Sequence, residues 1–221
     1  MKRPVWLSKF LIWRIRHISS RNFVMVLSGL VGVFGGLAAV TLKTAVHWIQ
    51  ATLGNLEGLW TQYAYLLFPV LGIVLTSIIA RKVLKARLGH GITGILYAIS
   101  KKSSILATAK TYSRMITSAI TVGFGGSVGL EAPIVVTGSA IGSNIGQLMH
   151  LNYRQRTLLI GCGAAAAISG IFNSPVAGVI FSIEVILTEV TIAAFIPLLI
   201  ASVFGSLISM LFLGESVLFS F

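Results

Sequence analysis

Residues 115–153 read MITSAITVGFGGSVGLEAPIVVTGSAIGSNIGQLMHLNY, and Glu131 is the only Asp, Glu, Lys or Arg among them. Sixteen uncharged residues precede Glu131 and 22 follow it. A carboxylate at the centre of a bilayer costs about 2.5–3.5 kcal/mol by insertion scales, so we expect Glu131 to face protein or water instead of lipid tails. This isolated acid is therefore the first candidate for function.

The residues around Glu131 predict the start of a helix. In Gly129-Leu130-Glu131-Ala132-Pro133 the proline suits a first turn, where its missing N–H loses no hydrogen bond. The unbonded N–H groups and the positive dipole end of such a start form an anion site. The Glu131 carboxylate would occupy that site when charged and leave it when protonated, which makes it a candidate gate and proton carrier. The alternative is a carboxylate held permanently as a structural cap.

The composition excludes an ordinary soluble protein. Apolar residues make up 56% of the 221 residues, charged residues make up 10%, and the mean hydropathy is +0.94. A soluble domain carries about 25% charged residues. Crossing a bilayer takes about 20 helical residues, and the uncharged runs that reach this length include 22–42, 58–80, 157–183 and 190–214. Dense glycine and proline in the later segments predict helices that break inside the membrane.

The distribution of charge favours a membrane partner. The chain has 17 Lys and Arg against five Glu, for a formal charge of +12. The basic residues lie between the apolar runs, which favours anionic lipid headgroups over nucleic acid. Residues 1–21 predict a basic amphipathic helix on the cytoplasmic face, or a frayed tail at its beginning, and residues 22–221 predict the membrane domain. Loop charge places the N-terminus and residues 81–87 in the cytoplasm and residues 44–57 outside, as in a multi-pass protein of the plasma (inner) membrane.

Other motifs carry weaker signals. Gly89-His90-Gly91-Ile92 predicts a second helix start whose N–H groups could face an ion, although such a pattern is more often a loop. Asn173 or Ser174 is expected to cap a helix beginning at Pro175, as a structural feature. Glycines spaced by four predict close helix packing and no ligand role; they are Gly138, Gly142 and Gly146, and Gly32 and Gly36. The histidines show no metal spacing and no catalytic set is visible, so we expect no metal, no cofactor and no enzyme activity.

Three of these stretches together resemble the CLC family of chloride channels and chloride/proton exchangers. Residues 129–133 are similar to its Gly-Lys/Arg-Glu-Gly-Pro motif, and residues 89–93 are similar to its Gly-Ser-Gly-Ile-Pro motif. Residues 164–178 resemble its Gly-Ala-Ala-Ala…Phe-Asn-Ala-Pro-Leu-Ala-Gly stretch, and Glu184 stands in the acidic position after it. Order and spacing agree from about Asn22 onward.

The resemblance implies an all-α integral membrane fold of broken and tilted helices, the first of two inverted repeats. It implies that Glu131 is the gating glutamate, which competes with chloride and carries protons. It also implies an anion path lined by main-chain N–H groups of Gly89, His90, Gly91, Ile92, Gly129, Leu130 and Ala132. Family members form homodimers, with residues 175–189 and the last span expected at the interface.

The chain departs from the family pattern in ways that leave alternatives open. His90 replaces a serine, and Leu130 and Ala132 replace the residues that flank the gating acid. Val185 stands where exchangers carry a second glutamate, which fits passive conduction or exchange by another proton path. We expect the second repeat to be absent. The alternatives to chloride transport are a fluoride-selective exchanger and a non-conducting half-subunit that needs a complementary chain.

Overall fold

The computed structural model describes residues 19–54, 61–83, 91–108, 112–187 and 191–214, and the regular elements within them are all helical. In chain order they are α2 (Ser20–Gly54), α3 (Thr61–Ile78), the π-helical turn η1 (Ile79–Val83), α4 (Thr93–Lys101), α5 (Ser113–Gly123), α6 (Glu131–Leu148), α7 (Tyr153–Phe172), α8 (Pro175–Phe181), the π-helical turn η3 (Ser182–Ile186) and α9 (Ile192–Leu213). The predicted amphipathic helix at residues 1–21 falls outside the described residues except for its last three.

Three of the described helices, α2, α7 and α9, are long and apolar enough to cross a membrane. This confirms the prediction that the chain contains helices able to span a membrane. The first span is longer than predicted, because α2 continues past residue 42 to Gly54 and Lys43 is buried within it. Residues 44–53 contain neither glycine nor proline to end the helix. The 35 residues of α2 extend about 52 Å, more than the bilayer core of about 30 Å.

The uncharged run 157–183 is interrupted, as the glycine and proline content predicts. The helix α7 ends at Asn173, which adopts the left-handed conformation with φ 56°. Pro175 then begins α8 as a separate short helix. The following turn, η3, ends at Ile186, before α9 returns along the molecule.

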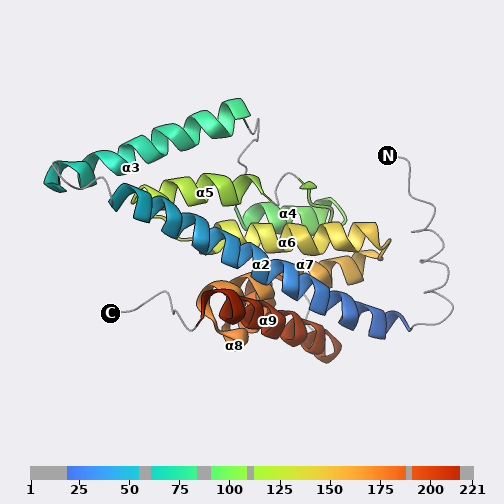
Figure 1. Ribbon diagram of the computed structural model, residues 1–221. Coiled ribbons are helices and arrows are strands. Elements are labelled where there is room, and N and C mark those ends of the chain that lie inside the picture. The colour runs from blue at the N-terminus through green and yellow to red at the C-terminus, as the bar shows by residue number, and fades with distance from the viewer. Residues whose placement is uncertain (1–18, 55–60, 84–90, 109–111, 188–190, 215–221) are drawn as a thin grey trace, which may run out of the picture.

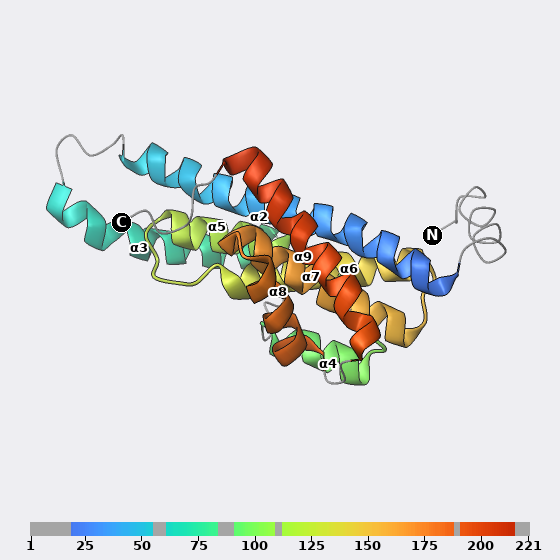
Figure 2. The same ribbon diagram turned by 90° about the horizontal axis from the view of Figure 1, so that it is seen from below.

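The helix α7 forms the centre of the packing, between α6, α2, α8 and α9 (Figures 1 and 2). Its residues from Leu159 to Ile171 are all buried, and most of them are glycine or alanine. A Cβ atom at Gly138 of α6 would clash with the main-chain oxygen of Gly163 in α7, and one at Gly163 would clash with that of Gly138. The prediction that the glycine stripes serve packing is therefore confirmed here, and a Cβ on Gly36 would also clash with the Gly205 main chain of α9.

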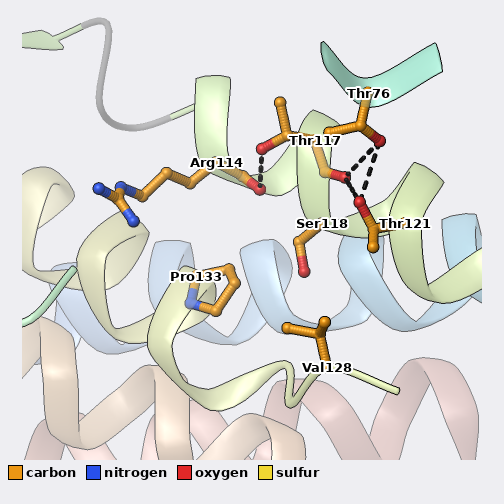
Figure 3. Close-up of a pocket in the computed structure, with 7 residues that line it drawn as sticks. All are labelled: Thr76, Arg114, Thr117, Ser118, Thr121, Val128 and Pro133. Atoms are coloured by element: carbon orange, nitrogen blue, oxygen red, sulfur yellow. Dashed lines mark hydrogen bonds between the residues drawn. The ribbon is translucent and has the colours of Figure 1, made fainter. Parts of the chain in front are cut away.

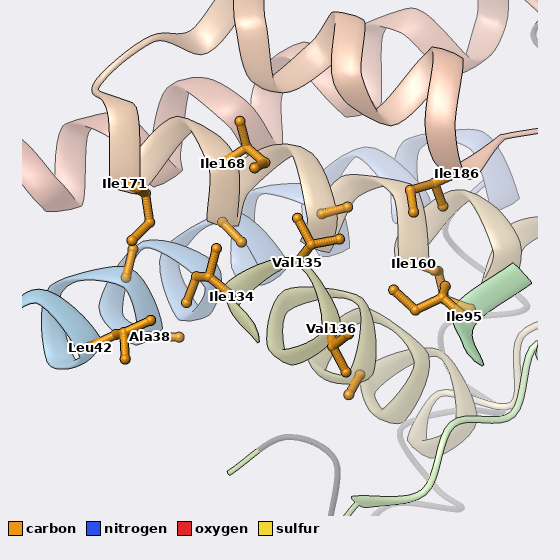
Figure 4. Close-up of a cluster of buried hydrophobic side chains, with 14 of the residues drawn as sticks. Ala38, Leu42, Ile95, Ile134, Val135, Val136, Ile160, Ile168, Ile171 and Ile186 are labelled. Carbon is orange, nitrogen blue, oxygen red and sulfur yellow. The ribbon is translucent and has the colours of Figure 1, made fainter. Parts of the chain in front are cut away.

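The larger of two buried apolar clusters fixes the elements that carry the candidate site (Figure 4). It joins Leu42 of α2, Ile95 of α4, Ile134 of α6 and Ile171 of α7, each no more than 1% exposed. Because α4 and α6 both begin beside this cluster, the two helices share one rigid support. Large apolar side chains are exposed on the outer faces of α2, α3 and α9, where a helical membrane protein meets lipid or further helices.

Candidate functional site

The chain enters α6 through a tight turn. Gly125 has φ 85°, a conformation that favours glycine, and residues 126–129 then run without helical structure to Glu131. Pro133 lies in the first turn, and the Ile134 N–H donates to the Leu130 oxygen at 3.1 Å. The helix therefore starts at Glu131, as the sequence predicts.

Several main-chain N–H groups at this start have no acceptor within the described ranges. Those of Gly129, Leu130, Glu131 and Ala132 make no hydrogen bond to any residue that the structure describes. The first N–H groups of a helix have no partner within it, and the helix dipole adds a partial positive charge there. The start of α6 thus presents four donors suited to an anion.

The Glu131 carboxyl lies beside these donors. Its carboxyl carbon is 3.2 Å from the position that a Cβ atom would take on Gly129, and its Oε2 is closer still. A side chain at residue 129 would therefore displace the carboxyl, so glycine is required for this close approach. The Glu131 side chain is exposed on the surface of the chain, and its carboxylate accepts no hydrogen bond from the described residues. The role of Glu131 as a gate or as a permanent cap stays a prediction.

The second predicted helix start is described in part. Gly91 and Ile92 precede α4, where the Gly94 N–H donates to the Gly91 oxygen and the Ile95 N–H donates to the Ile92 oxygen. Gly89 and His90 lie outside the described residues. The contribution of His90 to an anion path stays a prediction.

Arg114 of α5 connects the two helix starts, and the sequence reasoning missed it. Its Nη1 lies 3.9 Å from the position of a Cβ on Gly91, and Arg114 is also one of the residues that line a cavity with Pro133 of α6. One sequence signal points to it: Arg114 is the last basic residue before the uncharged run that leads to Glu131. It places a positive charge between the two proposed anion-binding segments.

The cavity beside Arg114 has a volume of about 240 Å³ and is polar on its α5 side (Figure 3). It is lined by Thr76, Arg114, Thr117, Ser118, Thr121, Val128 and Pro133. Thr76 and Thr121 hydrogen bond to each other through their hydroxyl groups at 2.9 Å. Ser118 is 8% exposed, and its buried hydroxyl has no hydrogen-bond partner in the part of the chain that the structure describes.

The third predicted helix start serves structure, but not in the way expected. Neither Asn173 nor Ser174 caps α8, because Ser174 makes no side-chain cap hydrogen bond and the Asn173 Oδ1 accepts one from Ser206 of α9 at 2.8 Å. Ser202 of α9 donates to the Pro175 oxygen at 2.6 Å. The break between α7 and α8 is therefore held by serines of α9 and not by a local cap.

The acidic position after this break also has a described environment. Glu184 is exposed on η3, whereas Val185 is partly buried and packs against the larger apolar cluster. The Val185 side chain has no titratable group, so this position offers no carboxylate for proton transfer.

Interrupted membrane helices whose starts present unbonded N–H groups are typical of membrane transport proteins. The described residues show such an interruption between α7 and α8 and such a start at α6. Residues 72–221, more than half of the chain, match the family model described as Voltage gated chloride channel. The chain therefore belongs to the voltage-gated chloride channel family, the CLC family that its motifs resemble.

Curated relatives agree with this assignment. The chain is 29% identical over 210 residues to a ClcB-like chloride channel protein of Ralstonia nicotianae, covering 89% of the chain and 48% of that protein. It is 30% identical over 189 residues to the H(+)/Cl(-) exchange transporter ClcA of Cronobacter sakazakii, covering 79% of the chain and 40% of that protein. The chain thus spans about half or less of the length of these relatives.

Solved structures show the same fold. A CLC-type fluoride/proton antiporter has a TM-score of 0.73 at 23% identity, with 89% of this chain and 48% of that one covered. A slow cyanobacterial Cl-/H+ antiporter has a TM-score of 0.72 at 22% identity, with 92% and 50% covered. The predicted fold class, an all-helical first half of a CLC-like membrane domain, is confirmed.

Proposed function

We propose that this chain takes part in moving chloride, or a related halide, across a membrane, with the start of α6 as an anion site and Glu131 as its gate. One observation supports the proposal: the Glu131 carboxyl lies against Gly129, in a segment where four main-chain N–H groups have no acceptor among the described residues. A helix start of this kind attracts a carboxylate and a small anion by the same interactions.

The competition between carboxylate and anion supplies a mechanism. The charged carboxylate occupies the positive end of the helix dipole and excludes a halide from it. Protonation removes its charge and therefore its attraction to the N–H groups, so a halide can take its place. The coupling of proton and halide movement follows directly from this exchange of two negative charges at one position.

Chloride is favoured because the named relatives are chloride channels and chloride/proton exchangers. Fluoride is the alternative, since one similar fold belongs to a fluoride/proton antiporter. Val185 favours passive conduction, or exchange in which protons reach Glu131 by another path, because this position lacks an acid.

The assembly is a further part of the proposal. The chain spans about half of the length of the relatives that it matches. We infer a homodimer in the plasma membrane, with the N-terminus in the cytoplasm and a complementary second-repeat half completing each pore. If no such half is present, the chain is a non-conducting subunit.

Flux measurements in liposomes test the proposal. Proteoliposomes loaded with chloride or with fluoride should release halide at a rate above that of empty vesicles, and a proton gradient should form if the two movements are coupled. Glu131→Gln should abolish proton movement while halide leak persists. Glu184→Gln is the matched control, because Glu184 is also exposed but lies on η3.

Two results would contradict these roles. Proton coupling that survives Glu131→Gln with unchanged stoichiometry removes Glu131 from the mechanism. Halide flux that appears only after co-expression with a second-repeat chain supports the half-subunit, whereas no flux in either preparation refutes transport.

A further inference from the structure

We propose that a pocket between the starts of α7 and α9 binds the phosphate headgroup of an anionic phospholipid. This α7–α9 pocket has a volume of about 620 Å³. It is lined by residues between 153 and 158 of α7, by Leu187 after η3, and by Thr191 and Ala194 at the start of α9. The inference concerns the lipid around the protein and goes beyond the halide transport proposed above.

The position of the pocket is that of lipid headgroups. The helices α7 and α9 are two of the three described helices that are long and apolar enough to cross a membrane, and both begin at this pocket. Spanning helices begin where lipid tails give way to headgroups. Tyrosine is enriched at that level, because its ring is apolar and its hydroxyl is polar, and Tyr153 in the lining is 47% exposed.

The lining is polar where it is exposed and apolar where it is buried. Arg154 and Thr191 are exposed, whereas Leu187 and Ala194 are buried. A free phosphate ion gains nothing from an apolar inner wall, but the glycerol backbone and first methylene groups of a lipid do. The volume is also about twenty times the roughly 30 Å³ that one water occupies, which is more than a free phosphate fills. The lining therefore matches a charged head joined to apolar chains.

The polar side chains of the lining decide the charge of that head. Arg154, Gln155 and Thr191 make no side-chain hydrogen bond or ion pair with any residue that the structure describes. Arg154 is the one charged residue among the described lining residues, and its guanidinium offers five N–H donors and stays protonated at physiological pH. Glu184 of η3 does not line the pocket. These free donors and this charge suit a phosphate and not a cation.

Basic residues beside the pocket act in the same direction. The Tyr153 hydroxyl donates to the Ile99 oxygen at 3.1 Å, which holds the end of α4 beside the start of α7. The exposed Lys101 and Lys102 lie at that end of α4. The positive dipole ends of α7 and α9 add to the attraction, and basic pockets between spanning helices are suited to anionic headgroups.

Native mass spectrometry of the delipidated full-length chain in detergent tests the site. The probes are phosphatidylglycerol and phosphatidylcholine with identical acyl chains, and glycerol 3-phosphate, which carries the phosphate without the chains. We expect phosphatidylglycerol to bind at least about fivefold more tightly than phosphatidylcholine, and glycerol 3-phosphate to bind most weakly. Arg154→Gln should weaken phosphatidylglycerol binding by about fivefold and remove most of this preference, whereas Arg154→Lys, which keeps the charge, should retain most of it.

A control variant and a crosslinking probe show where the lipid binds. Arg81→Gln removes an exposed arginine on η1, outside the pocket, and should leave the preference unchanged. A photoactivatable phosphatidylglycerol should crosslink to residues 153–158 and 191–194.

Three results would overturn the inference. The first is equal affinity for the two lipids, or a preference that Arg154→Gln leaves intact. The second is crosslinking confined to other surfaces of the chain. The third is glycerol 3-phosphate binding as tightly as phosphatidylglycerol, which would show a site for free phosphate and not for lipid. Because none of these measurements involves halide, each result leaves the proposed transport standing.

Discussion

The contact between α6 and α7 predicts that Gly138→Ala destabilises the protein. The added Cβ atom would lie closer to the Gly163 main-chain oxygen than the 3.0 Å that real Cβ atoms keep, so the two helices must separate. Overpacking of this kind costs about 1–3 kcal/mol, while alanine in place of a helical glycine returns up to about 1 kcal/mol. The clash is with main chain that cannot rotate away, so we expect a net loss of about 1–2 kcal/mol.

Thermal unfolding in detergent, followed by size-exclusion chromatography, measures this loss. The control is Gly29→Ala in α2, where the new Cβ would make ordinary contact at 3.5 Å with Phe204 and the gain in helix propensity is the same. We expect the melting temperature of Gly138→Ala to fall by a few degrees and that of Gly29→Ala to stay or rise. Equal melting temperatures for the two variants would show that α6 and α7 are not in the close contact described.

Three further substitutions test the packing around the site. Ser206→Ala removes the hydrogen bond that holds the junction of α7 and α8, and should lower the free energy of unfolding by about 1 kcal/mol; an unchanged denaturation midpoint would refute that role. Leu42→Ala empties a fully buried position and should cost about 2–5 kcal/mol, whereas Leu30→Ala on the same helix, 45% exposed, should cost much less; equal losses would contradict the burial assigned to Leu42. Tyr153→Phe removes a 3.1 Å hydrogen bond to the end of α4 and should cost about 0.5–1.5 kcal/mol by the same unfolding measurement, with no loss speaking against that contact.

The sequence was sufficient for features that depend on the backbone. Glycine and proline around Glu131 predict the start of α6. Proline fits the first turn of a helix, because the N–H groups there have no acceptor within the helix and the missing N–H of proline loses no bond. Asn173 and Pro175 similarly predict an interruption in the uncharged run. The spacing of Gly138 and Gly142 predicts a face of close packing, and that face does contact α7.

Features that depend on tertiary contact were not predictable in this way. The continuation of α2 to Gly54 buries Lys43, whose charge had suggested the end of a span. The approach of Arg114 to Gly91, and its place in a cavity with Pro133, follow from how α5 packs in the fold, and the sequence signal for Arg114 does not encode that position. The orphan hydroxyl of Ser118 becomes visible only when the surrounding partners are known.

The walls of the cavity are held by contacts that the membrane cannot supply. Lipid tails are as apolar as the side chains, so helices in a bilayer associate through close packing and hydrogen bonds and not through the hydrophobic effect. A Cβ at Gly72 of α3 would strike Phe124, one at Gly123 of α5 would strike Ile49 of α2, and one at Gly126 would strike the Thr121 oxygen. These close approaches thus depend on glycines that do not themselves line the cavity.

This arrangement separates the chemistry of the site from its geometry. The donors at the α6 start are main-chain groups, which most substitutions at the site itself would leave in place. Their direction depends on α5 and α6 keeping their distance, and the Gly126 N–H, which donates to the Thr121 oxygen at 2.9 Å, ties the end of α5 to the segment leading into α6. Substitutions at the distant glycines should therefore change halide affinity by moving the donors, even though they remove no donor.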